Sequence, residues 1–149
     1  MRFIYILIFA LIATLAQAAT DISGFWTTID DETNQPKSVV QIYQHNGKMF
    51  GRVVKLFQNP DATAKGVKGS PKIVGLDILW NLEDTGKKWT GGEILDPKTG
   101  KVYAAEAWKQ GDDLVVRGKI LMFGRNQTWK PNKDFSNPEK LTPQKPVRE

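Results

Sequence analysis

The segment 89–103, W-T-G-G-E-I-L-D-P-K-T-G-K-V-Y, constrains the fold more than any other stretch of the sequence. Asp96 is suited to begin a type I turn, Pro97 fixes φ at the second turn position, and Gly100 supplies the left-handed residue that returns the chain. Residues that favour β-structure flank this turn on both sides. The segment therefore predicts two antiparallel strands joined by a tight turn.

Short runs of apolar and β-branched residues recur along the chain, and each is bounded by Gly, Pro, Asn or Asp. This pattern predicts eight strands, at residues 24–30, 38–45, 48–57, 73–81, 87–96, 100–109, 113–120 and 123–130. The run 73–82 also fits a helical turn, and we expect a strand because the run is short. The whole pattern predicts an all-β fold, a single eight-stranded antiparallel up-and-down barrel. A two-sheet sandwich is the main alternative.

The N-terminus has the pattern of a secretory signal peptide. Met1-Arg2 forms a short basic head, residues 3–15 are apolar apart from Thr14, and A-Q-A at 16–18 fits a small-x-small cleavage site. We therefore expect a signal peptide at residues 1–18 and an exported protein, periplasmic or secreted, that does not span a membrane after cleavage. An uncleaved anchor is the alternative.

Removing residues 1–18 from the 149 leaves about 131 residues, enough for one domain. We expect the barrel domain at residues 19–130. From Pro131 onward the chain carries four prolines and few large apolar groups. Residues 131–149 are therefore predicted to be a Pro-rich C-terminal tail, either disordered or draped over the domain.

Two segments depart from the regular strand pattern. Residues 58–72 form the longest irregular segment before the tail, and such loops are often functional. This loop is interpreted either as a lid at the mouth of the barrel or as a solvated connector. The apolar run I-L-M-F at 120–123 stands where a turn is needed. We expect it to plug the end of the barrel because apolar residues are usually buried. Contact with a membrane or partner, or one uninterrupted strand, are the alternatives.

The composition argues against catalysis and metal binding. The sequence has no Cys, which excludes disulfides, and with a single His, His45, most routes to metal sites and nucleophilic catalysis are also removed. We therefore expect no cofactor, no metal and no catalytic residue. Glu106 is the one carboxylate with a candidate environment for a raised pKa, because it shares a strand face with Val102, Ala104 and Trp108. A structural or exposed role for Glu106 is favoured. Nucleic-acid binding is not expected, because the net charge of +5 is modest and no basic run interleaves with aromatics.

Five motifs together resemble a bacterial family of small exported proteins of unknown function with a lipocalin-like (calycin) barrel. They are G-F-W-T-T-I-D-D, G-K-M-F-G-R-V-V-K-L, the hairpin 89–103, L-V-V-R-G and F-G-R-N-Q-T-W. The resemblance runs from about Gly24 to Trp129 and implies a fold and a compartment, without an established activity. It also implies how the barrel closes, with Arg125 of the last strand packed over Trp26 of the first by cation–π attraction and planar stacking.

The barrel interpretation favours a protein that binds a small apolar or amphipathic molecule, such as a fatty acid or lipid fragment. Small alanines in the strand 100–109 leave space beside the sheet. An inward-facing Arg52 or Arg117 would pair with a carboxylate or phosphate head. The expected ligand-binding residues are Phe50, Arg52, Val54, Trp89, Tyr103, Ala105, Val116, Arg117 and Trp129. A solid core filled by the aromatic side chains is the structural alternative.

A cell-envelope interaction module with no ligand in the barrel is the alternative function. It rests on the positive net charge, on the apolar run 120–123, and on the lysines of the 58–72 loop, Lys65, Lys68 and Lys72. A basic surface favours anionic envelope partners such as lipid head groups. The two functions differ in site, because one uses the barrel interior and the other uses the outer surface.

Overall fold

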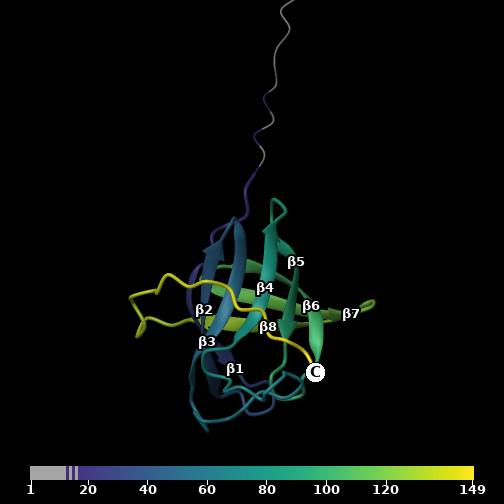
Figure 1. The fold of residues 1–149 in the computed structure, drawn as a ribbon. Coiled ribbons are helices and arrows are strands. Elements are labelled where there is room, and N and C mark those ends of the chain that lie inside the picture. Colours follow the sequence, from purple (N-terminus) through teal and green to yellow (C-terminus); the bar gives the residue numbers. More distant parts are fainter. Residues whose placement is uncertain (1–12, 14, 16) are drawn as a thin grey trace, which may run out of the picture.

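Eight antiparallel strands form a closed barrel in sequence order in the computed structural model, which describes residues 13, 15 and 17–149 (Figure 1). The expected signal peptide at 1–18 lies almost entirely outside the described residues. The strands are β1 (Gly24–Ile29), β2 (Pro36–His45), β3 (Lys48–Leu56), β4 (Asp77–Asp84), β5 (Trp89–Leu95), β6 (Val102–Gln110), β7 (Asp113–Ile120) and β8 (Phe123–Pro131). Within the described part of the chain, no helix is long and apolar enough to cross a membrane.

The predicted all-β architecture is confirmed, and the sandwich alternative is excluded because β8 pairs with β1 and closes the sheet. The largest boundary difference is at β4, which begins at Asp77 rather than at residue 73. The backbone at 73–76 turns there, with Gly75 N–H donating to Val53 O at 2.8 Å and Leu76 N–H donating to Ile73 O at 3.0 Å. The ambiguous run 73–82 therefore divides into a turn and a strand.

The barrel interior is filled by inward-facing side chains that alternate with outward-facing ones along each strand. Neighbouring strands bring these inward residues opposite one another, as in the pairs Trp26↔Val40, Ile42↔Gly51, Ala107↔Val116 and Leu114↔Trp129. At Gly51 the strands approach closely, because an added Cβ would lie 3.1 Å from Leu79 Cβ. The strand register shifts on both sides of this glycine, as expected for a bend in a closed sheet.

The C-terminal tail lies across the outer face of β2, β3 and β4, where it is the yellow segment in Figure 1. Gln41 Nε2 donates to Glu139 O at 2.8 Å, and an Arg52 guanidinium N–H donates to Thr142 O at 2.9 Å. Of the two forms considered for the tail, disordered or draped over the domain, the structure has the draped form. Because the tail covers the outer face, residues 38–43 of β2 are all buried.

The loop at 58–72 packs against the protein rather than serving as a solvated connector. Ala64 and Val67 are 2% and 3% exposed and belong to the main core cluster. Lys65 N–H donates to Pro97 O in the β5–β6 turn, and Lys68 N–H donates to Val147 O in the tail. The loop thus joins the β5–β6 turn to the end of the tail.

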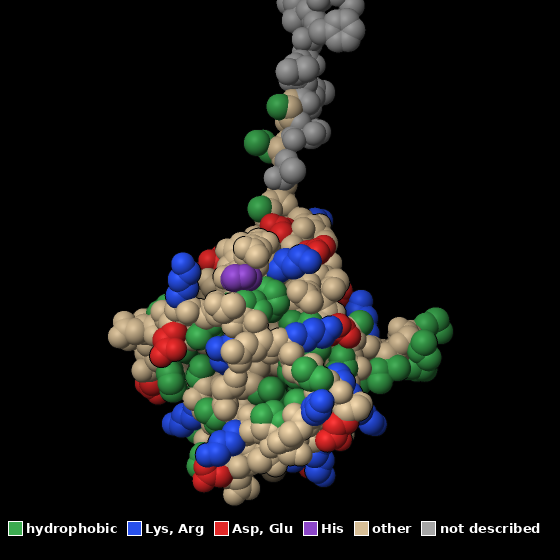
Figure 2. All heavy atoms as spheres, in the orientation of Figure 1, with side chains coloured by type: hydrophobic (Ala, Val, Ile, Leu, Met, Phe, Trp, Pro, Cys, Tyr) green, Lys and Arg blue, Asp and Glu red, His purple; other side chains and the backbone are tan. Residues whose placement is uncertain are grey.

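The run 120–123 projects away from the barrel, so the expectation that it plugs the barrel end is wrong. Leu121 and Met122 are 92% and 91% exposed, and Phe123 is 79% exposed. β7 and β8 remain paired up to Ile120↔Phe123, so the hairpin carries its own tip into solvent. Figure 2 shows this tip as an apolar projection at the right of the molecule.

Candidate functional site

The structure places five of the nine expected ligand-binding residues on the inner face of the barrel. These are Trp89, Tyr103, Ala105, Val116 and Trp129, all on β5 to β8. Four of the five are buried, and Tyr103 is half-buried.

The other four expected residues lie outside the barrel interior, which corrects their assignment. Phe50 is opposite Tyr43 on the outer face, with ring centroids 5.7 Å apart. Val54 is the extra residue of a bulge in β3 and is not part of the core cluster. Arg52 and Arg117 also face outward, toward Asp77 and toward Asn126 of β8. The sequence pattern of β3 does not show which face points into the barrel, because both faces are covered.

One end of the barrel is closed by tryptophans held by the segment that precedes β1. Trp26 Nε1–H donates to Ile22 O at 2.9 Å, and Trp89 Nε1–H donates to Thr20 O at 2.8 Å. The cation over the Trp26 ring is Lys109 of β6, with Nζ 4.9 Å from the ring centroid. We call this the closed end.

Arg125 occupies a different place from the one expected by resemblance. Its side chain is 70% exposed and its guanidinium lies 2.7 Å from Asp31, beyond the last residue of β1. Trp26 pairs instead with Pro131, six positions further along the chain. The first-strand tryptophan thus does have a cationic partner, but Lys109 of β6 supplies it, and Arg125 stands at the opposite end of the barrel.

At the opposite end, which we call the open end, the inward-facing residues of β5 to β8 are only half-buried: Ile94, Tyr103, Gly118 and Gln127. Gly118 leaves room there, because an added Cβ would make only ordinary contact with Tyr103 Cβ at 3.4 Å. The wall is mostly apolar and lies beside the solvent. Such a wall can contact the apolar part of a small molecule.

A chain of polar contacts runs from the buried core to the open end. Trp129 Nε1–H donates to Gln127 Oε1 at 3.2 Å, and Gln127 Nε2–H donates to Asp31 Oδ2 at 3.4 Å. Asp31 then pairs with Arg125. Sequence reasoning missed Gln127, although it shares the inner face with Trp129 two residues away. Asp31 follows β1 in the sequence, and only barrel closure brings it to β8.

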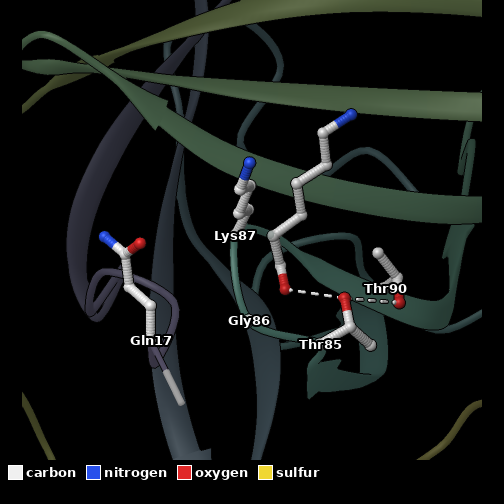
Figure 3. Close-up of a pocket in the computed structure, with 6 residues that line it drawn as sticks. Gln17, Thr85, Gly86, Lys87 and Thr90 are labelled. Carbon is white, nitrogen blue, oxygen red and sulfur yellow. Dashed lines mark hydrogen bonds between the residues drawn. The ribbon is translucent and has the colours of Figure 1, made fainter. Parts of the chain in front are cut away.

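A surface hollow of about 440 Å³ lies at the closed end, against the β4–β5 turn (Figure 3). It is lined by Gln17, Thr85, Gly86, Lys87, Lys88 and Thr90. Thr85 is held at this turn by its hydroxyl, which donates to Lys88 O at 3.1 Å. None of the expected ligand-binding residues lines it, and Gln17 falls within the expected signal peptide. The hollow is therefore not our candidate site.

Glu106, the carboxylate considered for acid–base chemistry, lies on the outer face of β6. Its carboxylate is 3.7 Å from Lys88 Nζ and 3.2 Å from Lys119 Nζ. It has no second carboxylate among these partners, so the arrangement is that of a surface ion-pair network. In the described part of the chain, no three His, Cys, Asp or Glu side chains gather in a way that would hold a metal ion.

Among the described residues, the most buried charge is that of Asp77 on the outer face of β4, beneath the tail. Its side chain is completely buried and accepts a bond from Arg52 Nε at 2.8 Å. Tyr43 Oη–H donates to the Asp77 carboxylate at 2.9 Å, and the Gln144 backbone N–H donates to the same carboxylate at 2.7 Å. Arg52 therefore has a structural partner in place of the ligand head group that was expected. Removing the Asp77 carboxylate from water has a high free-energy cost, and the hydrogen bonds from these partners offset it.

This cluster predicts a specific loss of stability at alkaline pH. Burial, and then the hydrogen bond to Asp77, raise the pKa of Tyr43 well above its ordinary value of 10.0. A raised pKa in the folded state contributes stability that is complete below the unfolded pKa and is lost as pH rises above it. We expect the free energy of unfolding to fall more steeply above about pH 10 in the wild type than in Tyr43→Phe, measured by urea denaturation. Tyr103→Phe is the matched control and should follow the wild type. Equal slopes for the wild type and Tyr43→Phe would contradict the assignment.

The comparisons with known proteins agree with this architecture. Residues 24–131 match the sequence model of a protein family described as uncharacterized and conserved in bacteria (DUF2147). No curated protein matches the chain. Among solved structures, the chain is similar to protein HP1028 from Helicobacter pylori, which is described as belonging to the lipocalin family. The identity is 21%, the TM-score is 0.63, and the match covers 78% of this chain and 86% of that chain. The barrel is therefore lipocalin-like.

Proposed function

We propose that this chain, which belongs to the uncharacterized bacterial family DUF2147, binds a small apolar or amphipathic ligand at the open end of its lipocalin-like barrel. The observation that supports this most directly is the half-buried inner wall of Ile94, Tyr103 and Gly118 beside the polar chain that ends at Arg125. A mostly apolar concave wall with a few polar groups is the usual form of a small-molecule site.

The filled closed end limits the size of this ligand. Trp26 and Trp129 are 5% and 1% exposed, so a ligand reaches only the outer part of the interior. A single acyl chain or lipid fragment fits this depth better than a large ring system. Its carboxylate would lie beside Arg125, whose guanidinium has more donors than its contact with Asp31 uses. We further propose that the protein is exported, which the signal-peptide pattern at 1–18 supports.

A dansyl-labelled fatty acid tests the proposed site directly. We expect saturable fluorescence enhancement with the wild type and binding at least about tenfold weaker with Gly118→Leu, a loss of roughly 1.4 kcal/mol. An added Cβ at this position makes only ordinary contacts with Tyr103 and Ile94, so the larger side chain is expected to occupy the open end, and circular dichroism checks that the variant is folded. Thr128→Leu adds similar bulk to the exposed outer side of the neighbouring strand and should bind like the wild type.

Two results would count against the proposal. One is the absence of saturable binding by the folded wild type. The other is equal affinity of Gly118→Leu and the wild type, which would place the probe elsewhere. Native mass spectrometry of protein purified from its host's envelope, followed by organic extraction, then identifies the chemical class of a ligand carried from the cell.

A further inference from the structure

We propose that the tip of the β7–β8 hairpin, residues 120–123, inserts into an anionic lipid surface. This inference shares only Arg125 with the open-end ligand site, and its test changes other residues. The tip presents four consecutive apolar side chains, and Leu121 and Met122 are 92% and 91% exposed. In Figure 2 the tip stands clear of the rest of the surface. Consecutive exposed apolar residues are unusual on a protein that has no partner for them.

The turn at the tip uses residues that are poor turn formers. Leu121 and Met122 connect the paired residues Ile120 and Phe123, and Leu121 has a φ of 56°. Two-residue hairpin turns of this kind normally place Asn or Gly at a positive φ, because leucine is disfavoured there. The other tight hairpins of this chain follow that rule, with Asn46 and Gly47 at β2–β3. At the β7–β8 turn, apolar side chains are present at the expense of backbone preference.

Cationic side chains surround the base of the tip. Arg117 lies flat against Gly124, where an added Cβ would fall within 2.5 Å of its guanidinium carbon, and it bonds to the neutral Asn126. Lys119 and Arg125 stand on the same two strands and make exposed contacts with Glu106 and Asp31.

The spacing of these charges fits a membrane surface. At roughly 3.3 Å per strand residue, Lys119 and Arg125 lie about 7–10 Å from the turn. An apolar element that enters the head-group boundary is buried by about 5–10 Å. The apolar tip would thus reach the acyl boundary while the cations remain level with anionic phosphates, which attract Lys and Arg. This match of charge and depth favours an anionic lipid surface over an uncharged apolar surface.

A protein partner is less well matched to the tip. Stable protein–protein interfaces bury about 800 Å² on each partner, contributed by some 20–30 residues. Four side chains at the end of a two-stranded hairpin do not provide that area. Insertion into a fluid lipid surface requires no complementary pocket.

Vesicle co-sedimentation tests the inference. We expect the protein to bind vesicles of phosphatidylglycerol and phosphatidylcholine, and to bind phosphatidylcholine vesicles at least about tenfold more weakly. The variant Leu121→Asn with Met122→Gly installs a favoured hairpin turn, so the hairpin should form while binding to the anionic vesicles falls by at least about tenfold. Arg117→Gln should weaken that binding about fivefold. Circular dichroism confirms that each variant is folded.

Val147→Asn is the matched control, because it removes an exposed apolar side chain (63% exposed) from the tail instead of the tip. It should bind anionic vesicles as the wild type does. The inference is overturned by no binding of the wild type, by equal binding of the tip variant, or by equal binding to both vesicle compositions. A wild type that sediments as a dimer without lipid, beside a monomeric tip variant, would identify a second copy as the occupant and would also overturn it.

Discussion

Asp77→Ala is expected to lower the free energy of unfolding by about 3–5 kcal/mol, measured by urea denaturation, because it breaks a buried ion pair from one side. The substitution leaves Arg52 without its carboxylate and leaves Tyr43 Oη–H and the Gln144 N–H without their acceptor. All three donors converge on a side chain that is completely buried. Water cannot replace the carboxylate at full strength while the tail covers the site.

Asp61→Ala is the matched control for this prediction. Asp61 also pairs with a cation, Lys72 at 2.9 Å, but the two side chains are 85% and 65% exposed. Its loss should cost about 0–1 kcal/mol, because solvent screens such a pair. If Asp77→Ala cost no more than Asp61→Ala, the buried cluster would not be a main contributor to stability.

The fold could be predicted because its determinants are local in the sequence. Turn residues such as Asn46-Gly47 and the segment 96–100 mark the reversals, and both reversals are present in the structure. Alternation along β6, β7 and β8 puts Ala105, Val116 and Trp129 on the inner face. These features act within a few residues, which is the range that a sequence pattern describes.

The errors arise where a distant segment decides the environment. The outer face of β3 carries Phe50 and Arg52 and is covered because the tail, some 90 residues further on, lies across it. Nothing within β3 shows whether Phe50 and Arg52 point into the barrel or under the tail. Gln127 meets Asp31 only because β8 closes on β1. The prediction that residues 120–123 plug the barrel end was wrong for a different reason. It applied the general preference of apolar residues for burial to a hairpin that extends beyond the barrel.

Trp26→Ala is expected to lower the free energy of unfolding by about 3–5 kcal/mol, through lost burial and the cavity left behind. Trp26 is 5% exposed, its ring packs into the core cluster, and its indole N–H is bonded to Ile22 O. The loss also removes an anchor for the segment that precedes β1. The midpoint of urea unfolding should therefore fall clearly. A midpoint equal to that of the wild type would show that Trp26 does not hold the closed end.

Variants of the two cationic residues separate the structural role of Trp26 from the pairing that the resemblance implied. Lys109 Nζ lies over the Trp26 ring, so Lys109→Met should cost about 0.5–1 kcal/mol in the wild type and nothing further in Trp26→Ala. Arg125→Gln should cost less than about 1 kcal/mol in either background, because its pair with Asp31 is exposed and lies at the open end. Coupling between Arg125 and Trp26 in this double-mutant cycle, with none for Lys109, would restore the last-strand arginine as the partner of Trp26.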